Sequence, residues 1–290
     1  MFAQKKIRVV VQKSAGPSSK YNDEYNFVNL PIEVKINKAI LPAGYSAQIN
    51  IYGISKEKMD SITTIAWKTG MIDNKVIMVY ANDGDGEHLL FQGTIMSAFP
   101  NYNSAPDICI SITACAGAYN NLVTDVPPSS IKEGQQVPVR QVFQTICDQY
   151  GMELDFRDER EIYCKFPRTE GNGLGDRLAR AARTYNMNVT MDGVNVRVWP
   201  KDTYAYNSQS LEFTKKDYIG YPSFTTMGID LKLDVLKRSM TLGDFFTIKG
   251  SDVSAANDKW SVTKIGFNIS TKIGGKWEMD ISAVRVGVQS

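Results

Sequence analysis

The sequence contains a single histidine, His88, and it follows a short acidic stretch that holds Asp83, Asp85 and Glu87. A histidine beside carboxylates can act as a general base, and alternating acidic residues faintly resemble a calcium loop. The twelve-residue spacing that ends in a bidentate glutamate is absent, and no obvious nucleophile adjoins His88. Asp-Gly pairs are also what tight hairpin turns require. We therefore expect a solvated hairpin here, and we assign neither a catalytic nor a metal site to it.

A second acidic stretch could supply the two carboxyl groups of a glycosidase. Its members are Asp155, Asp158, Glu159 and Glu161. A glycosidase acid needs an apolar pocket that raises its pKa. Arg157 and Arg160 interleave with these carboxyls, which favours a solvated loop whose charges balance one another. A cell-wall hydrolase or peptidase that uses residues 153–161 stays as an alternative function.

Residues 171–176 read Gly-Asn-Gly-Leu-Gly-Asp and precede a segment with helical spacing. A glycine-rich loop before a helix can cradle phosphate. This loop lacks the Gly-Lys-Ser/Thr ending, and no hydrophobic strand runs directly into it. We expect a flexible approach to a helix, with Asp176 in the first turn.

The tryptophans could form stacking platforms for bases or sugars. Around Trp277 the sequence alternates Trp-Glu-Met-Asp, which is typical of a strand with one buried face, so we expect core positions. A carbohydrate-binding module that uses Trp199 is the other alternative. No pattern assigns a catalytic, cofactor-binding or metal-binding residue, and we expect a protein that is not an enzyme and has no cofactor.

The overall composition excludes several classes of protein. Charged residues make up 22% and hydrophobic residues 43%, as in ordinary globular proteins. The 33 basic and 31 acidic residues are interspersed, so the sequence lacks the basic stripe of a DNA-gripping protein. The four cysteines, at 109, 115, 147 and 164, form no Cys-x-x-Cys pair, which indicates buried thiols in a reducing compartment. We expect neither a signal peptide nor a membrane span.

Residues 45–116 show the clearest local patterns. Ala47, Ile49 and Ile51 alternate with polar residues, as in a strand with one wet face. Ser55 can cap a short helix, whose apolar stripe is Met59, Ile62, Ile65 and Ala66. Residues 76–80 are apolar throughout and predict a central strand, which the Asp-Gly turn joins to a strand at 89–96. With strands at 7–11, 32–36 and 107–116 and a polar loop at 15–26, these elements predict a small β-barrel with one flanking helix.

Residues 130–200 show helical periodicity and an internal repeat. Two helix–strand units follow each other with an offset of 35 residues, as in Tyr150 and Tyr185 or Met152 and Met187. Gly151 and Asn186 occupy the same place just after each predicted helix, where a left-handed residue is favoured. We expect a compact α/β domain that ends in a hairpin at 191–199. Residues 211–290 return to alternation and predict a second antiparallel barrel or sandwich.

Two sets of short motifs carry a resemblance to a known family. Residues 49–55 read Ile-Asn-Ile-Tyr-Gly-Ile-Ser, and residues 90–95 read Leu-Phe-Gln-Gly-Thr-Ile. The second set consists of Leu242, Gly243, Asp244, Ile248, Trp260, Val262, Ile265, Phe267, Ile269, Ser270, Thr271 and Trp277. In this order and spacing they resemble bacteriophage tail baseplate hub proteins, the family that includes the Mu-like and P2-like tail hubs.

The resemblance implies a mainly β fold with an α+β insert, in which two tail-tube-like antiparallel β-barrels flank a small α/β domain. We expect an N-terminal barrel with one helix at residues 1–125, the insert at 126–203, and the second barrel at 204–290. The boundary near residue 126 coincides with a polar, proline-containing stretch.

The resemblance also implies a structural role in the virion. The chain would form a homotrimer, a pseudo-six-fold ring that joins the hexameric tail tube above to the trimeric spike below and contacts other baseplate proteins. DNA would pass through the lumen without sequence-specific binding, and assembly would occur in the host cytoplasm. Relatives in secretion systems continue into an oligonucleotide-fold domain and a spike, so we expect the spike here to be a separate chain.

Overall fold

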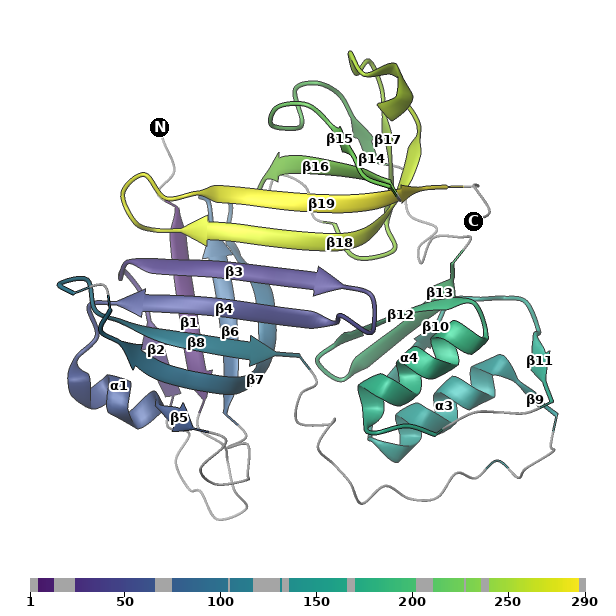
Figure 1. Ribbon diagram of the computed structural model, residues 1–290, viewed down its shortest axis with the longest axis horizontal. Coiled ribbons are helices and arrows are strands. Elements are labelled where there is room, and N and C mark those ends of the chain that lie inside the picture. Colours follow the sequence, from purple (N-terminus) through teal and green to yellow (C-terminus); the bar gives the residue numbers. More distant parts are fainter. Residues whose placement is uncertain are drawn as a thin grey trace.

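Most strands of the computed structural model join in one large sheet (Figure 1). The structure describes residues 5–12, 24–65, 75–103, 105–116, 131, 136–165, 170–201, 211–226, 228–235 and 240–286. Within these residues the sheet has 14 strands, and its main path is β15-β16-β19-β18-β3-β4-β8-β7-β6-β1-β2. All but one of its pairings are antiparallel, since β14 pairs in parallel with β17. The expected mainly β fold with an α/β insert is confirmed.

The first half of the chain forms one side of this sheet. Its strands are β1 (Lys6–Gln12), β2 (Glu24–Phe27), β3 (Ile32–Ala39), β4 (Tyr45–Tyr52), β5 (Thr64–Ile65), β6 (Val76–Asn82), β7 (Glu87–Asn101) and β8 (Cys109–Cys115). Helix α1 (Lys56–Ile62) begins at Ser55, whose hydroxyl accepts a hydrogen bond from the backbone N–H of Lys58 at 3.5 Å, as predicted. β1 and β6 pass behind β3 and β4 at a steep angle, so this half curls around its core (Figure 1).

Three predictions in this half need correction. Helix α1 ends at Ile62, so Ile65, which was expected on its apolar stripe, lies in strand β5, and Ala66 lies outside the described residues. The segment expected to be a polar loop ends in a short strand, β2, which pairs with β1. β2 has only four residues, so its alternation of apolar and polar side chains was too short to predict a strand. β6 is central, between β1 and β7, but only alternate residues are buried, so it is not buried on both faces.

The last part of the chain forms the other side of the sheet. Its strands are β14 (Leu211–Phe213), β15 (Ser223–Phe224), β16 (Ile229–Asp234), β17 (Phe245–Ile248), β18 (Lys259–Ser270) and β19 (Trp277–Arg285), with a short 3-10 helix η1 (Ser254–Ala256). Gly243 has φ +87°, and the Asp244 carboxylate accepts a hydrogen bond from the backbone N–H of Thr241 at 2.8 Å. The Gly-Asp pair of the motif therefore makes a tight turn before β17.

The two halves repeat one arrangement of five strands. Both the order in the sequence and the order in the sheet agree: β3-β4-β8-β7-β6 in the first half corresponds to β15-β16-β19-β18-β17 in the second. The neighbours within each set are all antiparallel. We call these two sets the first unit and the second unit.

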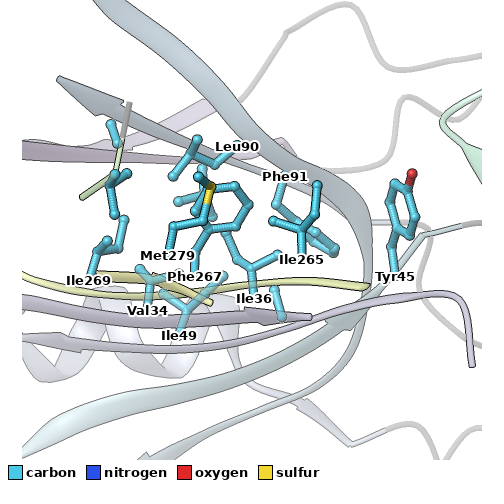
Figure 2. Close-up of a cluster of buried hydrophobic side chains, with 14 of the residues drawn as sticks. Val34, Ile36, Tyr45, Ile49, Leu90, Phe91, Ile265, Phe267, Ile269 and Met279 are labelled. Atoms are coloured by element: carbon cyan, nitrogen blue, oxygen red, sulfur yellow. The ribbon is translucent and has the colours of Figure 1, made fainter. Parts of the chain in front are cut away.

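A single hydrophobic core serves both units (Figure 2). Val34 and Ile36 of β3 lie beside Ile265, Phe267 and Ile269 of β18, and all five are at most 8% exposed. Among the described residues, no pairing closes either unit into a barrel. The physical reason is that β18 pairs with β17 only at its start and then pairs with β3, so a strand that could close one unit joins the two units instead.

The insert has its own smaller core. Helices α3 (Val139–Gln149) and α4 (Leu174–Thr184) pack on a three-stranded sheet of β10 (Glu153–Phe156), β13 (Asn195–Pro200) and β12 (Met187–Asp192), beside a small β9–β11 pair (Val137–Pro138 and Tyr163–Cys164) (Figure 1). The 35-residue repeat is confirmed: the helix bounds differ by 35, and Gly151 and Asn186 have φ of +63° and +55°. The expected domain boundaries near 126 and 203 lie outside the described residues, and the three-part division stays a prediction.

Candidate assembly surface

The residues around His88 are part of a hairpin whose charges are paired. Glu87 receives two hydrogen bonds from Arg8, one of them 2.7 Å from Nε, and the Arg8 guanidinium lies 4.1 Å from the centre of the Tyr80 ring. The hydrogen bonds from Arg8 hold the pKa of Glu87 below its ordinary value. His88 is exposed on β7. Among the described residues, no three His, Cys, Asp or Glu side chains are grouped to hold a metal ion.

The acidic stretch after β10 is paired with arginines. Asp155 is bound by Arg157 and by Arg197, whose Nε lies 3.1 Å from Oδ2, and Asp158 is bound by Arg160 at 2.9 Å. Burial raises the pKa of both aspartates, but the hydrogen bonds from the arginines outweigh it and leave both pKa values below normal. A glycosidase acid needs a shift in the opposite direction. The expectation of self-balanced charges describes this geometry better than a hydrolase site does.

The glycine-rich approach to α4 is occupied by its own carboxylate. The backbone N–H of Asn172 donates to Asp176 at 2.9 Å, and Arg180 donates to the same carboxylate at 3.0 Å. These bonds, first from Arg180 and then from Asn172, lower the pKa of Asp176. The acidic residue therefore takes the place that a phosphate would need at this helix start.

The tryptophans that the structure describes are buried, both those expected in the core and Trp199 of the carbohydrate-binding alternative. Trp199, Trp260 and Trp277 are at most 5% exposed, and the indole of Trp260 donates a hydrogen bond to the carbonyl of Ala256 at 2.9 Å. Rings so buried present no face on which a base or a sugar could stack. In the part of the chain that the structure describes, no helix is long and apolar enough to span a membrane.

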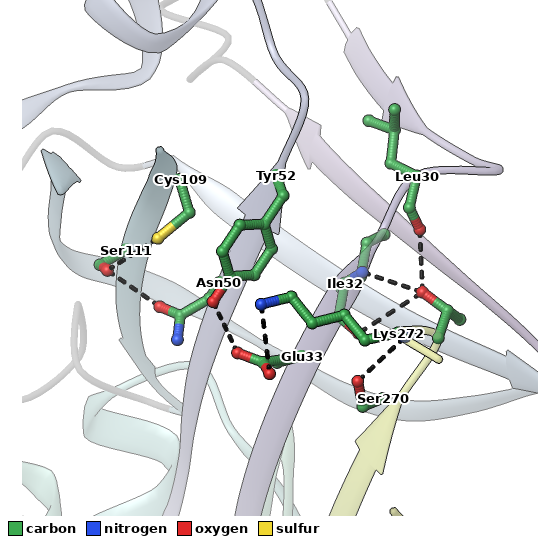
Figure 3. Close-up of polar contacts among 10 residues, drawn as sticks. Leu30, Ile32, Glu33, Asn50, Tyr52, Cys109, Ser111, Ser270 and Lys272 are labelled. Carbon is green, nitrogen blue, oxygen red and sulfur yellow. Dashed lines mark hydrogen bonds and ion pairs between the residues drawn. The ribbon is translucent and has the colours of Figure 1, made fainter. Parts of the chain in front are cut away.

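A polar network reinforces the pairing of β3 with β18 (Figure 3). The Thr271 hydroxyl donates to the carbonyl of Leu30 and accepts from the N–H of Ile32, each at 2.8 Å. The Lys272 ammonium lies 3.5 Å from the centre of the Tyr52 ring, and both side chains contact Glu33, the ammonium at 3.6 Å and the Tyr52 hydroxyl at 2.7 Å. These contacts attach the hairpin between β18 and β19 to β3 and β4. They therefore stabilise the register in which β18 of the second unit pairs with β3 of the first unit.

One face of the sheet is polar across six neighbouring strands. The registers place two rows of side chains on this face, running in turn along β16, β19, β18, β3, β4 and β8. The first row is Asp234, Glu278, Asn268, Lys35, Gln48 and Thr113, and the second is Lys232, Asp280, Gly266, Asn37, Ser46 and Cys115. We call this surface the polar face. Its strands carry the carboxylates Glu33, Asp230, Asp234, Glu278 and Asp280 and the lysines Lys35, Lys232 and Lys264. Lys272 and Lys276 of the hairpin between β18 and β19 place their ammonium groups beside Glu33 and Glu278, so acidic and basic groups are interspersed.

Exposed aromatic side chains lie at one end of the sheet and at the end of strand β7. β15, the end of the path on one side, is accompanied by Tyr221 and Phe224, which are 72% and 48% exposed. The last part of β7 and the residue after it carry Phe99 and Tyr102, each 50% exposed. Large aromatic side chains beside sheet edges are typical of contacts with another protein chain.

Described residues anchor the insert on the large sheet through a backbone hydrogen bond and a buried side chain. The backbone N–H of Leu41, between β3 and β4, donates to the carbonyl of Val189 on β12 at 2.8 Å. Trp199 of β13 belongs to the large core. Beside these links lies a groove of about 770 Å³, lined on one side by residues near Tyr45 and on the other by α4 residues such as Arg183. The insert thus keeps a core of its own and contributes Trp199 to the core of the large sheet.

Comparison with known proteins agrees with this architecture. Residues 7–273 match the family described as baseplate hub gp41, and the chain belongs to this family. The resemblance to phage tail hubs found in the sequence is therefore confirmed, and the chain is a structural component of phage tails. No curated protein sequence matches the chain.

Solved structures of tail proteins share the fold. A tail protein from Neisseria meningitidis MC58 has a TM-score of 0.63 at 11% identity, covering 99% of this chain and 98% of its own. The 43 kDa tail protein of prophage MuSo2 from Shewanella oneidensis has a TM-score of 0.61 at 10% identity and covers 96% of each chain. The E. coli c3393 protein, a type VI secretion component described as similar to the T4 tail proteins gp27 and gp5, has a TM-score of 0.55 at 9% identity and covers 89% and 74%.

Proposed function

We propose that three copies of this chain form the ring of a phage tail baseplate hub. The ring has pseudo-six-fold symmetry, and it joins a hexameric tail tube above to a trimeric spike below. The supporting observation is the repeated five-strand arrangement within one sheet. Along the sheet, β15-β16-β19-β18 is followed by β3-β4-β8-β7, and because each neighbour is antiparallel, a shift by four strands preserves strand direction. Three copies then supply six equivalent groups, which is what matching a hexamer to a trimer requires.

The two units are, in this proposal, the two tail-tube-like barrels expected from the sequence, at residues 1–125 and 204–290, with residues 126–203 bracing the outside. Within the described residues each unit curls without closing, and the units join edge to edge in the ring. A sheet with open ends in the single copy suits a subunit whose neighbours supply the missing strands.

The polar face is proposed to line a channel through which DNA passes. Small polar side chains such as Ser46 and Asn37 give it a wet surface, and its carboxylates and lysines are interspersed. A wall of this kind has no basic stripe that would neutralise phosphates, so DNA slides along it without being gripped. This accords with a role that involves neither sequence-specific binding nor catalysis.

The proposed partners are a tail tube protein, a separate spike protein and other baseplate proteins, with assembly in the host cytoplasm. Negative-stain microscopy and mass photometry of the purified chain, alone and with its neighbouring tube and spike proteins, test the proposal. Three-fold rings with an open centre and three times the chain mass of 32.3 kDa are expected. Monomers under every condition, including the mixtures, would overturn it.

A further inference from the structure

β7 and β18 hold equivalent places in the two units, and each has a bulge where its pairing changes. β18 pairs with β17 at residues 259–261 and with β3 from residue 264, and its register against β19 shifts between Val262 and Lys264. β7 pairs with β6 as far as residue 94, and its register against β8 shifts between Ile95 and Ser97. The two bulges therefore mark the same point in both units.

Residues that lie directly opposite one another on neighbouring strands show which positions of the two units are equivalent. In the first unit the row is Ile36, Ala47, Ala114 and Ile95, and in the second it is Phe224, Ile229, Ala283 and Val262. Seven of these eight residues are at most 2% exposed, whereas Phe224 is 48% exposed. Phe224 thus occupies the position of Ile36, but among the described residues no strand pairs with β15 on the side where β18 pairs with β3.

The strand that covers Ile36 is β18. Phe267 lies directly opposite Ile36, and Ile269 follows two residues later. Val262 and Ile95 are the equivalent residues just before the two bulges. Counted forward from them by the same number of residues, Phe267 corresponds to Pro100 and Ile269 corresponds to Tyr102. Ile269 is 0% exposed, whereas Tyr102 is 50% exposed. We call the pairing of β3 with β18, which joins the two units inside the chain, a seam. The second unit has a strand equivalent to β3, namely β15, and the first unit has a strand equivalent to β18, namely β7. Each unit therefore carries one half of a second seam of the same kind.

We infer that β15 of one copy pairs with the last part of β7 in the next copy, in the register that β3 and β18 adopt within the chain. Phe224 then lies opposite Pro100 of the next copy, and Ser223 lies opposite Asn101 of the next copy. The partner is a second copy of this chain in a head-to-tail contact, and the inference rests on the proposed ring.

The chemistry of the two edges suits this contact. The seam starts at Phe99, because β5 already pairs with Ser97 and Ala98. It buries Phe224 and Tyr102 and brings Tyr221 close to residue 103 of the next copy. Such aromatic side chains are enriched at protein interfaces and contribute much of the binding energy. Since the seam is only about five residues long, a ring that closes all three seams together is favoured over an open dimer.

Cysteine cross-linking tests the register. Directly opposed positions on antiparallel strands lie within disulfide range. The variant carries Asn101→Cys and Ser223→Cys with Cys109→Ser, because Cys109 lies opposite Asn101 within the chain. Oxidation is expected to give covalent trimers on non-reducing gels, and each single cysteine variant is expected to give none. The matched control is Lys35→Cys with Asn268→Cys, the equivalent pair inside the chain, which should form a disulfide without joining copies.

The outcomes separate this inference from the proposed function. Rings in mass photometry without a cross-link between positions 101 and 223 would overturn the seam and leave the ring intact. An absence of rings for the unmodified chain, with tube and spike proteins present, would overturn the ring itself. A second variant, Phe224→Asp, is expected to weaken ring formation at least tenfold while its thermal unfolding stays that of the parent. Ile273→Asp, at an exposed hairpin tip away from the seam, should form rings normally, and equal ring formation by both variants would contradict the inference.

Discussion

Phe267 on β18 lies directly opposite Ile36 on β3, and this pair lies at the centre of the seam that joins the two units. The two residues come from opposite ends of the chain, yet they are 8% and 1% exposed and belong to one core. The position of the insert between the two units in sequence therefore does not divide the β structure into separate cores. The two units are expected to unfold together.

Replacing Phe267 by alanine should lower the free energy of unfolding by about 3–5 kcal/mol, because it leaves a cavity in the shared core. Urea denaturation of the purified chain, followed by tryptophan fluorescence, measures the change. Ile273→Ala is the control, since Ile273 is fully exposed, and it should change the value by less than about 0.5 kcal/mol. Two separate transitions for the β structure of the parent protein would contradict a shared core.

Thr271→Val should destabilise the seam by about 1–3 kcal/mol, because valine keeps the shape but leaves the carbonyl of Leu30 and the N–H of Ile32 without the hydroxyl that bonds both. Thr271→Ser retains the hydroxyl and should recover most of the loss. Thr113→Val on the polar face is the control for removing a threonine hydroxyl from the sheet. Equal denaturation midpoints for Thr271→Val and the parent would show that these two bonds contribute nothing.

Local patterns predicted much of this fold, because they depend on burial within single elements. The alternation around Ile49 fixed the inward face of β4, and the repeat predicted the left-handed residues Gly151 and Asn186. The seam was not predictable from these patterns. The alternation of apolar and polar residues in β3 and β18 shows which face of each strand is buried, but it does not show which strands are neighbours. The signal that could have found it was the polar alternate set on both strands, with Lys35 and the half-buried Asn268 among them, which matches across the seam.

Gly93→Ala should be strongly destabilising, because a Cβ at this position would lie 2.7 Å from Phe91 Cζ and 2.8 Å from the carbonyl oxygen of Cys115. This crowding gives a physical reason for the glycine in the motif at residues 90–95. Overpacking of this kind costs about 1–3 kcal/mol, and a backbone oxygen has little room to yield. Gly266→Ala is the matched control on β18, since its nearest heavy atom would be 3.7 Å away, and it should be tolerated. Similar denaturation midpoints for both variants would contradict the argument.

Lys38 is a charged side chain on the inward face of β3, at the junction with the insert. Its ammonium lies 5.3 Å from the centre of the Tyr45 ring and 6.0 Å from that of Phe267. Burial lowers the pKa of Lys38, and Asp192 of the insert opposes this shift only in part. The folded state therefore binds the proton of Lys38 less tightly than the unfolded chain does, so the charge costs stability at neutral pH.

Lys38→Met should accordingly raise the free energy of unfolding at pH 7, since it keeps the length of the side chain and removes the buried charge. The sign of the pH dependence follows from the lowered pKa of Lys38. The destabilisation caused by its buried charge is fully present below the folded-state pKa. It disappears as the pH rises past the ordinary pKa of 10.5, because Lys38 is then neutral in both the folded and the unfolded chain. The advantage of the variant over the parent should therefore shrink between pH 7 and pH 10 in urea titrations. Lys35→Met, at an exposed position on the opposite face, should show no such pH-dependent advantage. An advantage of Lys38→Met that stays constant or grows over this range would show that the buried charge is not its cause.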